Sequence, residues 1–324
     1  MQAYLVRRIL LFIPTIFISS VIIFVVMRVL PGDVAQLILS DEETGEGPES
    51  MELVNTIREE LGLNDPIPIQ YGRWIWTFVN GEFGGRSLWN REPLSKIIGR
   101  RLPVTLQLTV YTALIGWAFA IPLGVLAAIH QNRWPDYVIR VGTVLGHTLP
   151  NFWIALMIIL GLLIFFRWTP PLFYEHVWDN PSVHFQKVIW PVMILAWSFS
   201  STLTRVTRSN MLEVLRQDYV RTARSKGLVE RVIIFRHALR NALLPVITIG
   251  GLQLGAFLSG TVILESIFGL PGIGQGVVLA ANERDYPVIQ SLVLLLVSMQ
   301  LILNLIVDIS YVFADPRVSY AKAK

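Results

Sequence analysis

The sequence contains no cysteine, which excludes disulfide bonds, thiolate metal sites, iron–sulfur clusters and cysteine nucleophiles. It also contains no Gly-Lys dipeptide, so it has no phosphate-binding loop of the G-x-x-x-x-G-K-[ST] type and cannot hydrolyse ATP by that route. Charged residues make up only 15% of the 324 residues, against about 25% in an ordinary soluble domain. A soluble enzyme of the common kinds is therefore a poor description of this chain.

What the sequence does have is long apolar blocks, and 53% of its residues are hydrophobic. A bilayer core about 30 Å thick requires about 20 mostly apolar residues per helix. Six stretches reach or approach that length, at about residues 9–30, 103–129, 137–166, 188–204, 245–268 and 287–313. The fourth is the shortest and is rich in Ser and Thr. The sequence predicts an all-α integral membrane protein with six transmembrane helices.

The distribution of basic residues predicts how these helices are oriented. Arg7 and Arg8 precede a first apolar run of 22 residues, which is longer than the apolar part of a signal peptide, about 7–15 residues. Nine Lys and Arg residues lie between Arg205 and Arg240, whereas the two short loops on the opposite side have few. By the positive-inside rule, both termini are cytoplasmic. The basic residues lie between spans and do not indicate binding to nucleic acid.

This topology divides the chain into four parts. Residues 1–30 form the cytoplasmic N-terminus and first span, and residues 31–97 form a small external subdomain. Residues 98–313 form the core, and residues 314–324 a cytoplasmic tail. Within the external part, "GPESMELVNTIREELGL" predicts a short amphipathic helix, and Trp74 and Trp76 are expected at the membrane interface. The alternative is a loop that merely packs on its own spans.

The basic loop, residues 205–244, is too long and too patterned to serve topology alone. Asp218 is placed to cap a first short helix, "YVRTARSK", and Gly227 follows it as a left-handed C-terminal glycine would. A second helix, "VERVIIFRHALRNALL", leads to Pro245, where the fifth span is expected to begin. Two short helices hinged at a glycine would give a soluble partner a structure to bind.

The loop and six further segments carry a resemblance to a known family. In order along the chain, the further segments are "YLVRRIL", "VLPGD", "LGLNDPIPIQYGRW", "RLPVTLQL", "ESIFGLPGIGQ" and "DPRVSY", and the loop itself contains "RHALRNALLPV". Together they resemble the permease subunits of ABC importers, in the branch that serves oligopeptides, dipeptides and nickel. The chain is similar to the B-type permease of oligopeptide and dipeptide importers over essentially its whole length.

The resemblance implies a type I ABC importer permease fold in a prokaryotic plasma (inner) membrane. It implies a second, homologous permease subunit, two cytoplasmic ATP-binding subunits that bind ATP-Mg, an external substrate-binding protein, and no cofactor in this chain. The cargo it implies is a short peptide, or a related solute such as a nickel chelate, a glutathione-like peptide or an oligosaccharide. The chain would be a transport subunit and not an enzyme.

The resemblance also assigns the loop the role of docking on the ATPase. The residues implied are Arg221, Thr222, Ala223, Arg224, Lys226, Gly227, His237, Arg240 and Pro245. The first two positions of the family's Glu-Ala-Ala motif are occupied here by Arg221 and Thr222, as in the peptide branch. The arginines and Lys226 would steer the partner, and Ala223 and Gly227 would permit close approach. In the plainer reading, Gly227 only ends a helix and Pro245 only begins a span.

The fifth span offers candidates for the translocation path. Gly251, Gly255 and Ser259 are four residues apart, a spacing that lets membrane helices pack closely. This face would contact either the second permease or a helix of the same chain. Gln253 within the span and Glu265 near its outer end are polar residues that a membrane rarely contains without a function. Gln107, Asn304 and Asp308 are further polar candidates in other spans.

Two other classes of membrane protein fit the sequence less well. A stand-alone secondary transporter or channel would require inverted repeats and ionisable residues at mid-membrane, and neither is evident. A membrane-embedded enzyme would require a catalytic cluster, and none is recognisable. His176 and His184 share a loop with Glu175 and Asp179, but their spacing fits no standard metal site, so no metal is expected.

Overall fold

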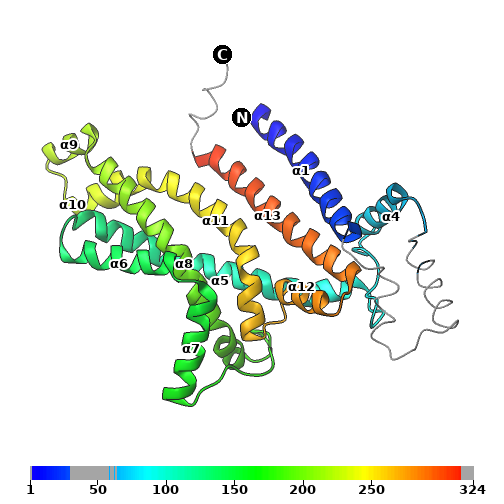
Figure 1. Ribbon diagram of the computed structural model, residues 1–324. Coiled ribbons are helices and arrows are strands. Elements are labelled where there is room, and N and C mark those ends of the chain that lie inside the picture. The colour runs from blue at the N-terminus through cyan, green and yellow to red at the C-terminus, as the bar shows by residue number, and fades with distance from the viewer. Residues whose placement is uncertain (1, 30–57, 59–61, 63, 315–324) are drawn as a thin grey trace. The chain divides into compact units, whose positions relative to one another are not determined.

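The computed structural model describes residues 2–29, 58, 62 and 64–314, and in this part of the chain the regular structure is helical (Figure 1). The helices are α1 (Gln2–Val29), α4 (Ile67–Val79), α5 (Leu94–Ile129), α6 (Trp134–Thr148), α7 (Asn151–Phe166), α8 (Pro181–Leu215), α9 (Asp218–Ser225), α10 (Glu230–Val232), the π-helix η1 (Ile233–Ala238), α11 (Leu239–Phe268), α12 (Ile273–Asn282) and α13 (Tyr286–Ala314). An isolated β-bridge joins Arg86 and Pro93. The amphipathic helix expected within residues 47–63 falls almost wholly outside the described residues.

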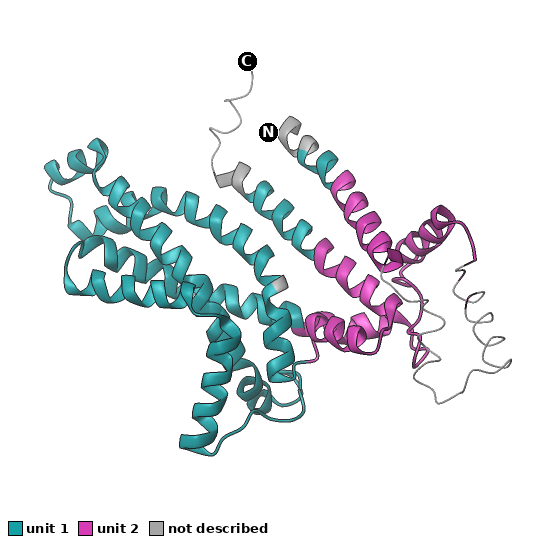
Figure 2. Cartoon of the chain, viewed as in Figure 1, with its two compact units in different colours: residues 1–12, 105–270, 299–324 teal, residues 13–104, 271–298 magenta. Residues whose placement is uncertain are grey.

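The chain separates into two compact units, coloured in Figure 2. Unit 1 comprises residues 1–12, 105–270 and 299–324, and unit 2 comprises residues 13–104 and 271–298. Residues of the predicted external segment therefore belong to one unit with most of α1, with α12 and with the start of α13.

Unit 1 is built around α8, which packs against α6, α7 and α11. Phe199 and Leu203 of α8 are fully buried, together with Ala120 of α5 and Val246 of α11. Several Ser and Thr residues of α8 are buried as well, and Ser201 donates its hydroxyl to the carbonyl of Trp197 at 2.7 Å. A backbone carbonyl of the same helix thus accepts the hydrogen bonds of Ser200 and Ser201, whereas the hydroxyls of Thr204 and Thr207 are buried without a hydrogen-bond partner among the described residues.

Unit 2 has a smaller core of aromatic side chains. Trp74 of α4 is 8% exposed, and its ring lies 5.7 Å from Phe24 of α1 and 5.3 Å from Phe78, measured between ring centroids. Leu294 of α13 completes the cluster. Trp74 is thus covered by other side chains of the same unit, and its place at the membrane interface stays a prediction. Trp76, two residues on, points to the opposite side and is 65% exposed.

By length and composition, α1, α5, α13 and the helix from Glu230 to Leu258 are each able to cross a membrane, and two bent helix pairs raise the number to as many as six. One pair is α6 with α7, bent by 102°. The predicted third span, residues 137–166, is thus not one straight helix. Pro150 follows Leu149, and a residue before proline is driven out of the helical conformation; Leu149 accordingly has φ −72° and ψ 129°.

The second bent pair is Gly260–Phe268 with Ile273–Asn282, bent by 76°. Gly269 ends α11 in the left-handed conformation with φ +60°, which glycine adopts without strain. The chain therefore turns sharply within "GLPGIGQG". The predicted fourth span, residues 188–204, lies in α8, which is not among the helices that qualify by composition. Its crossing of the membrane stays a prediction.

Candidate functional site

The basic loop occupies a narrower part of the chain than residues 205–244. Residues 205–215 continue α8, and residues 239–244 belong to α11, so the segment between the two long helices runs from residue 216 to residue 238. Met211 at the end of α8 is buried against Ala238 and Ala242. This apolar contact extends both long helices beyond the apolar runs visible in the sequence, because it covers one side of each.

A small apolar cluster holds the loop together. Val220 and Ala223 of α9 are buried against Ile233 of η1, and Leu215 packs on the same cluster. Ala223 is only 8% exposed. The sequence-based expectation that Ala223 permits close approach of a partner is therefore wrong, since this side chain is covered by its own chain. Its small size instead lets α9 lie close against η1.

Gly227 ends the first short helix as predicted. It has φ +75°, a left-handed conformation that residues with a side chain adopt at a cost, and its amide donates to the carbonyl of Arg224 at 2.9 Å. A Cβ atom at this position would meet nothing within 4 Å. The need for glycine is thus one of backbone conformation. At the other end of α9, the N-cap residue is Gln217 rather than Asp218, so the predicted cap lies one residue earlier.

One ion pair joins the two halves of the loop across Gly227, and a second lies within α9. The guanidinium of Arg224 donates to both carboxylate oxygens of Glu230, at 3.2 and 2.7 Å, and this pairing raises the pKa of Arg224. Arg221 lies 3.6 Å from Asp218. Both pairs are substantially exposed and contribute little to stability. Arg224 is therefore engaged within the loop, whereas Arg221 is 72% exposed.

The outward side of the loop combines apolar and basic side chains, and we refer to it as the loop surface. Its exposed apolar members are Leu228, Val229, Val232 and Phe235. Its exposed basic members are Arg221, Lys226, Arg231, Arg236 and Arg240. Large exposed apolar groups within one short segment are typical of a protein interaction site, and basic residues around them add specificity and faster encounter.

The remaining predicted loop residues lie at its edges. Thr222 is exposed and donates to the carbonyl of Asp218 at 3.0 Å. His237 is partly buried, and its carbonyl accepts from Asn241 at 3.4 Å. Asn241 also donates to the hydroxyl of Tyr219 at 2.8 Å, which links α9 to the first turn of α11.

Pro245 does not begin a span, contrary to the sequence-based expectation. It lies inside α11, which starts at Leu239. A proline within a helix removes one backbone hydrogen bond, but Ala242 and Val246 on either side are both buried and hold the helix continuous. The π-helix η1 directly precedes α11. Such wide turns are rare and often mark functional sites.

A buried ion pair anchors the base of the loop, and sequence reasoning did not find it. Arg208 of α8 donates to both carboxylate oxygens of Asp136 in α6, each at 2.7 Å. Asp136 is fully buried, and its side chain also accepts from the amide of Asn132 at 3.0 Å. The two residues are 72 positions apart, and no local pattern pairs one arginine of a basic run with one particular acid.

The small residues of α11 face the same chain. A Cβ at Gly251 would lie 2.2 Å from Val307 of α13, and one at Gly255 would lie 2.9 Å from the side-chain oxygen of Asn304. The sequence left open whether this face contacts the second permease or a helix of the same chain. In the structure, Gly251 and Gly255 both lie against α13 of the same chain. Ser259 lies in α11, but its side chain is outside the described residues.

The polar candidates of the spans have separate surroundings. Glu265 is fully buried and accepts from Thr105 of α5 at 2.8 Å. Among the described residues, the side-chain oxygen of Gln253 is buried without a hydrogen-bond partner. Gln107 accepts from Tyr174 at 2.8 Å, and Asp308 lies 3.0 Å from Arg8 of α1. These side chains do not form one cluster.

The histidines give no metal site. His176 stacks on Trp178, with ring centroids 4.6 Å apart, and His184 is fully buried with Nδ1 3.0 Å from the carbonyl of Glu175. Within the described part of the chain, no group of three or more His, Asp or Glu side chains is placed to hold a metal ion.

A comparison with models of protein families identifies the family of this chain. Residues 120–320 match the model described as "Binding-protein-dependent transport system inner membrane component", and residues 1–109 match the model of the N-terminal part of such membrane components. The chain belongs to this family. It is a multi-pass permease subunit of a bacterial inner membrane and not an enzyme, and ATP is bound by partner ATPases. Membership in this family also argues against the two alternatives, a stand-alone secondary transporter and a channel.

Two relatives illustrate the similarity of this permease to characterised systems. It is 39% identical to the oligopeptide transport system permease protein AppB of Bacillus subtilis (strain 168), over 99% of this chain and 100% of the relative. It is 35% identical to the glutathione transport system permease protein GsiC of Salmonella paratyphi A, again over 99% of this chain and 100% of the relative. The family's description implies a binding protein as a partner.

Proposed function

We propose that this permease forms half of the translocation path of an ATP-driven importer for short peptides, and that its loop surface docks on a cytoplasmic ATPase. The proposal that the cargo is a peptide rests on the full-length similarity to an oligopeptide permease. The glutathione permease among the relatives transports a small peptide as well, so the two names agree on the class of cargo.

The complete importer in this proposal contains a second, homologous permease, two ATP-binding subunits and an external binding protein. Both termini are on the cytoplasmic side, as the distribution of Lys and Arg predicts. Residues 216–238 then lie on the side where ATP is available. The pathway residues Gln253 and Glu265 remain candidates for contact with the cargo.

Docking is supported by the composition and rigidity of the loop surface. Val229 is 69% exposed and Phe235 is 56% exposed, and both follow the turn at Gly227, beside the buried cluster of Val220, Ala223 and Ile233 that holds α9 against η1. A rigid apolar centre within a basic rim has the general anatomy of a protein interface. Movement of the docked ATPase would be transmitted directly to α8 and α11.

The test of docking is co-purification of the chain from its native membrane in mild detergent. We expect a second permease and ATP-binding subunits with the wild-type chain, and loss of the ATP-binding subunits alone from a Val229→Asp, Phe235→Asp variant. The matched control is Leu172→Asp, because Leu172 is 88% exposed but lies on the opposite side in the predicted topology. Retention of the ATPase by the loop variant, or equal loss in the control, would contradict docking through this surface.

The test of cargo is competition for uptake in cells that carry the intact system. A labelled tripeptide should accumulate, and unlabelled di- to pentapeptides should compete with it in proportion to their affinity for the binding protein. Uptake of a nickel chelate or an oligosaccharide with no effect of peptides would refute peptide import while leaving the permease class intact.

A further inference from the structure

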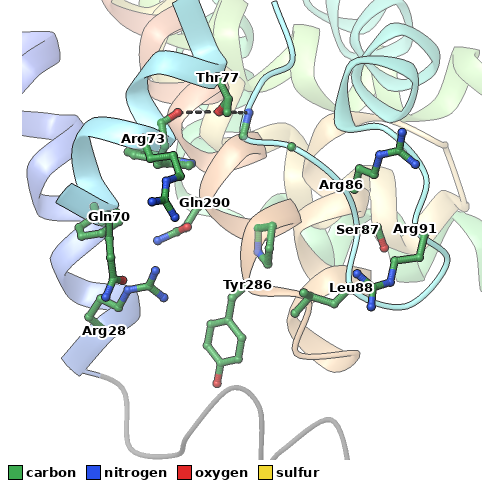
Figure 3. A pocket seen from close by; sticks show the side chains of 15 residues that line it. Arg28, Gln70, Arg73, Thr77, Arg86, Ser87, Leu88, Arg91, Tyr286 and Gln290 are labelled. Carbon is green, nitrogen blue, oxygen red and sulfur yellow. Dashed lines mark hydrogen bonds between the residues drawn. The ribbon is translucent and has the colours of Figure 1, made fainter. Parts of the chain in front are cut away.

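A pocket of about 430 Å³ lies within unit 2 and is independent of the loop surface. It is lined by Phe24 and Arg28 of α1, by Gln70, Arg73, Trp74 and Thr77 of α4, by residues 84–88 and Arg91 of the following loop, and by Tyr286, Pro287 and Gln290 of α13. In Figure 3, side chains from α1 and α4 lie on one side of the pocket and those of the loop on the other, with Tyr286 between them.

The charge of the lining is entirely positive. Four arginines contribute to it, Arg28, Arg73, Arg86 and Arg91, and no Asp or Glu is among the lining residues. Asp65 lies outside the lining and is 2.8 Å from Arg73, so it offsets the charge of that arginine. Arg28 stands over the ring of Phe24 at 5.0 Å. Among the described residues, Arg28 has no carboxylate partner.

The buried polar atoms of the lining include three nitrogen donors that lack an acceptor in the described part of the chain. They are Nε of Arg28, Nε1 of Trp74 and the amide nitrogen of Gln290. A buried donor without an acceptor costs free energy, and buried groups of this kind in native proteins usually have a partner. A ligand that supplies acceptor oxygens and negative charge would satisfy these donors and the arginines together.

The loop is shaped so that these groups can converge. Gly84 has φ +99°, and a Cβ there would lie 2.3 Å from the hydroxyl oxygen of Ser291 and 3.2 Å from Nε1 of Trp74. The backbone therefore passes directly over the indole. Further along, the amide of Leu88 donates to Asp285 at 3.2 Å, and the hydroxyl of Ser87 donates to the same carboxylate. These contacts fix residues 84–88 against the start of α13.

The position of the pocket relative to the membrane-spanning helices selects the class of ligand. Arg28 lies in the last turn of the span Arg8–Val29, and Tyr286 and Gln290 lie in the first turns of the span Tyr286–Ser310. Both candidate spans, defined by length and composition, have an end at this pocket, which puts it at the expected membrane boundary, where lipid phosphates are concentrated. Near Arg28, Val25, Val26 and Val29 are exposed apolar residues that provide surface for acyl chains.

We propose that this pocket binds the phosphate of an anionic phospholipid at the end of α1. Arg28 and Arg86 hold the phosphate by charge-assisted hydrogen bonds, Gln290 and Trp74 donate further hydrogen bonds, and the valines of the last turns of α1 contact the acyl chains. The binding ties α1, α4 and α13 together at the membrane boundary. This inference does not depend on the cargo or on the docking of the ATPase.

The test measures lipid retention by the purified transport complex, so its outcome is independent of peptide import. The delipidated complex is titrated with phosphatidylglycerol or phosphatidylcholine, and native mass spectrometry counts the lipids bound per complex. We expect one phosphatidylglycerol site per copy of this chain, with phosphatidylcholine bound about tenfold more weakly or worse. An Arg28→Gln, Arg86→Gln variant should lose at least that factor for phosphatidylglycerol.

The matched control is Arg133→Gln with Arg167→Gln, which removes the same charge from exposed arginines at the ends of other helices. Equal affinity for the two lipids in the wild-type complex would overturn the proposal, even if the pocket variant fails to assemble. So would equal retention by the pocket variant and the control. Displacement of the lipid by inorganic phosphate alone, or by a peptide with a free carboxylate, would instead assign the pocket to a soluble anion.

Discussion

Replacement of Asp136 by asparagine should destabilise the permease far more than the same replacement at an exposed acid. Asp136 is fully buried and is held by two contacts of 2.7 Å to Arg208, whose side chain is 20% exposed. Removal of one partner of a buried ion pair costs about 3–5 kcal/mol. Because Arg208 can be partly rehydrated, we expect the lower end, about 3 kcal/mol, for Asp136→Asn.

The assay is thermal unfolding of the purified chain in detergent. A loss of about 3 kcal/mol corresponds to a fall in Tm of about 6–12 °C in a domain of this size. Asp218→Asn is the matched control, because Asp218 is 96% exposed and 3.6 Å from Arg221. Its Tm should change by no more than about 2 °C. Equal changes in the two variants would refute the reasoning.

A double variant distinguishes the contribution of the ion pair to stability from the contribution of side-chain packing. Arg208→Met in the background of Asp136→Asn removes the uncompensated buried charge, so it should be more stable than Asp136→Asn alone. If the second change instead adds its full cost to the first, the pair is not coupled and the stability must come from another contact.

Three further predictions follow from the glycines and from Tyr174. Gly251→Ala should lower stability by about 1–3 kcal/mol through overpacking, because the new Cβ would lie 2.2 Å from Val307. Gly161→Ala, which meets nothing within 4 Å, should be neutral or stabilising in the same Tm measurement; equal losses would contradict the packing argument. Gly227→Ala should cost about 1–2 kcal/mol for its left-handed backbone alone, and Gly227→Asn, which tolerates that conformation better, should recover part of the loss. Burial raises the pKa of Tyr174 from 10.0 to about 12, so the folded state keeps this proton while the unfolded chain loses it, and stability falls as pH rises between those values. Ultraviolet titration of the folded protein should therefore show no tyrosinate from Tyr174 near pH 10, and a loss of amplitude there in Tyr174→Phe would contradict this.

The sequence by itself determined the class of the protein and the approximate limits of most helices. Apolar runs of membrane length predict α1, α5 and α13 because a lipid environment leaves few alternatives to a helix. The left-handed Gly227 was also predictable, since a glycine after a basic helical turn is a local signal. The family followed from motifs distributed over the whole chain, which need no knowledge of packing.

The tertiary structure decided where helices continue through residues that locally signal an end. Pro245 looked like the start of a span, but buried neighbours carry α11 through it. The weakly apolar run at residues 188–204 became the centre of unit 1, because α8 packs against α6, α7 and α11 and Ser200 and Ser201 donate to a backbone carbonyl of their own helix. Apolar content measures affinity for lipid, and a helix that is covered by other helices does not need it.

Contacts between residues far apart in the chain likewise could not be predicted from the sequence. Asp136 pairs with Arg208, and Glu265 with Thr105 at a separation of 160 residues, and nothing local distinguishes these partners from their neighbours. The converging donors of Arg28, Trp74 and Gln290 come from three helices. Charge and apolar pattern are properties of single segments and could be read from the sequence, whereas the pairing of segments depends on packing, which only the folded chain specifies.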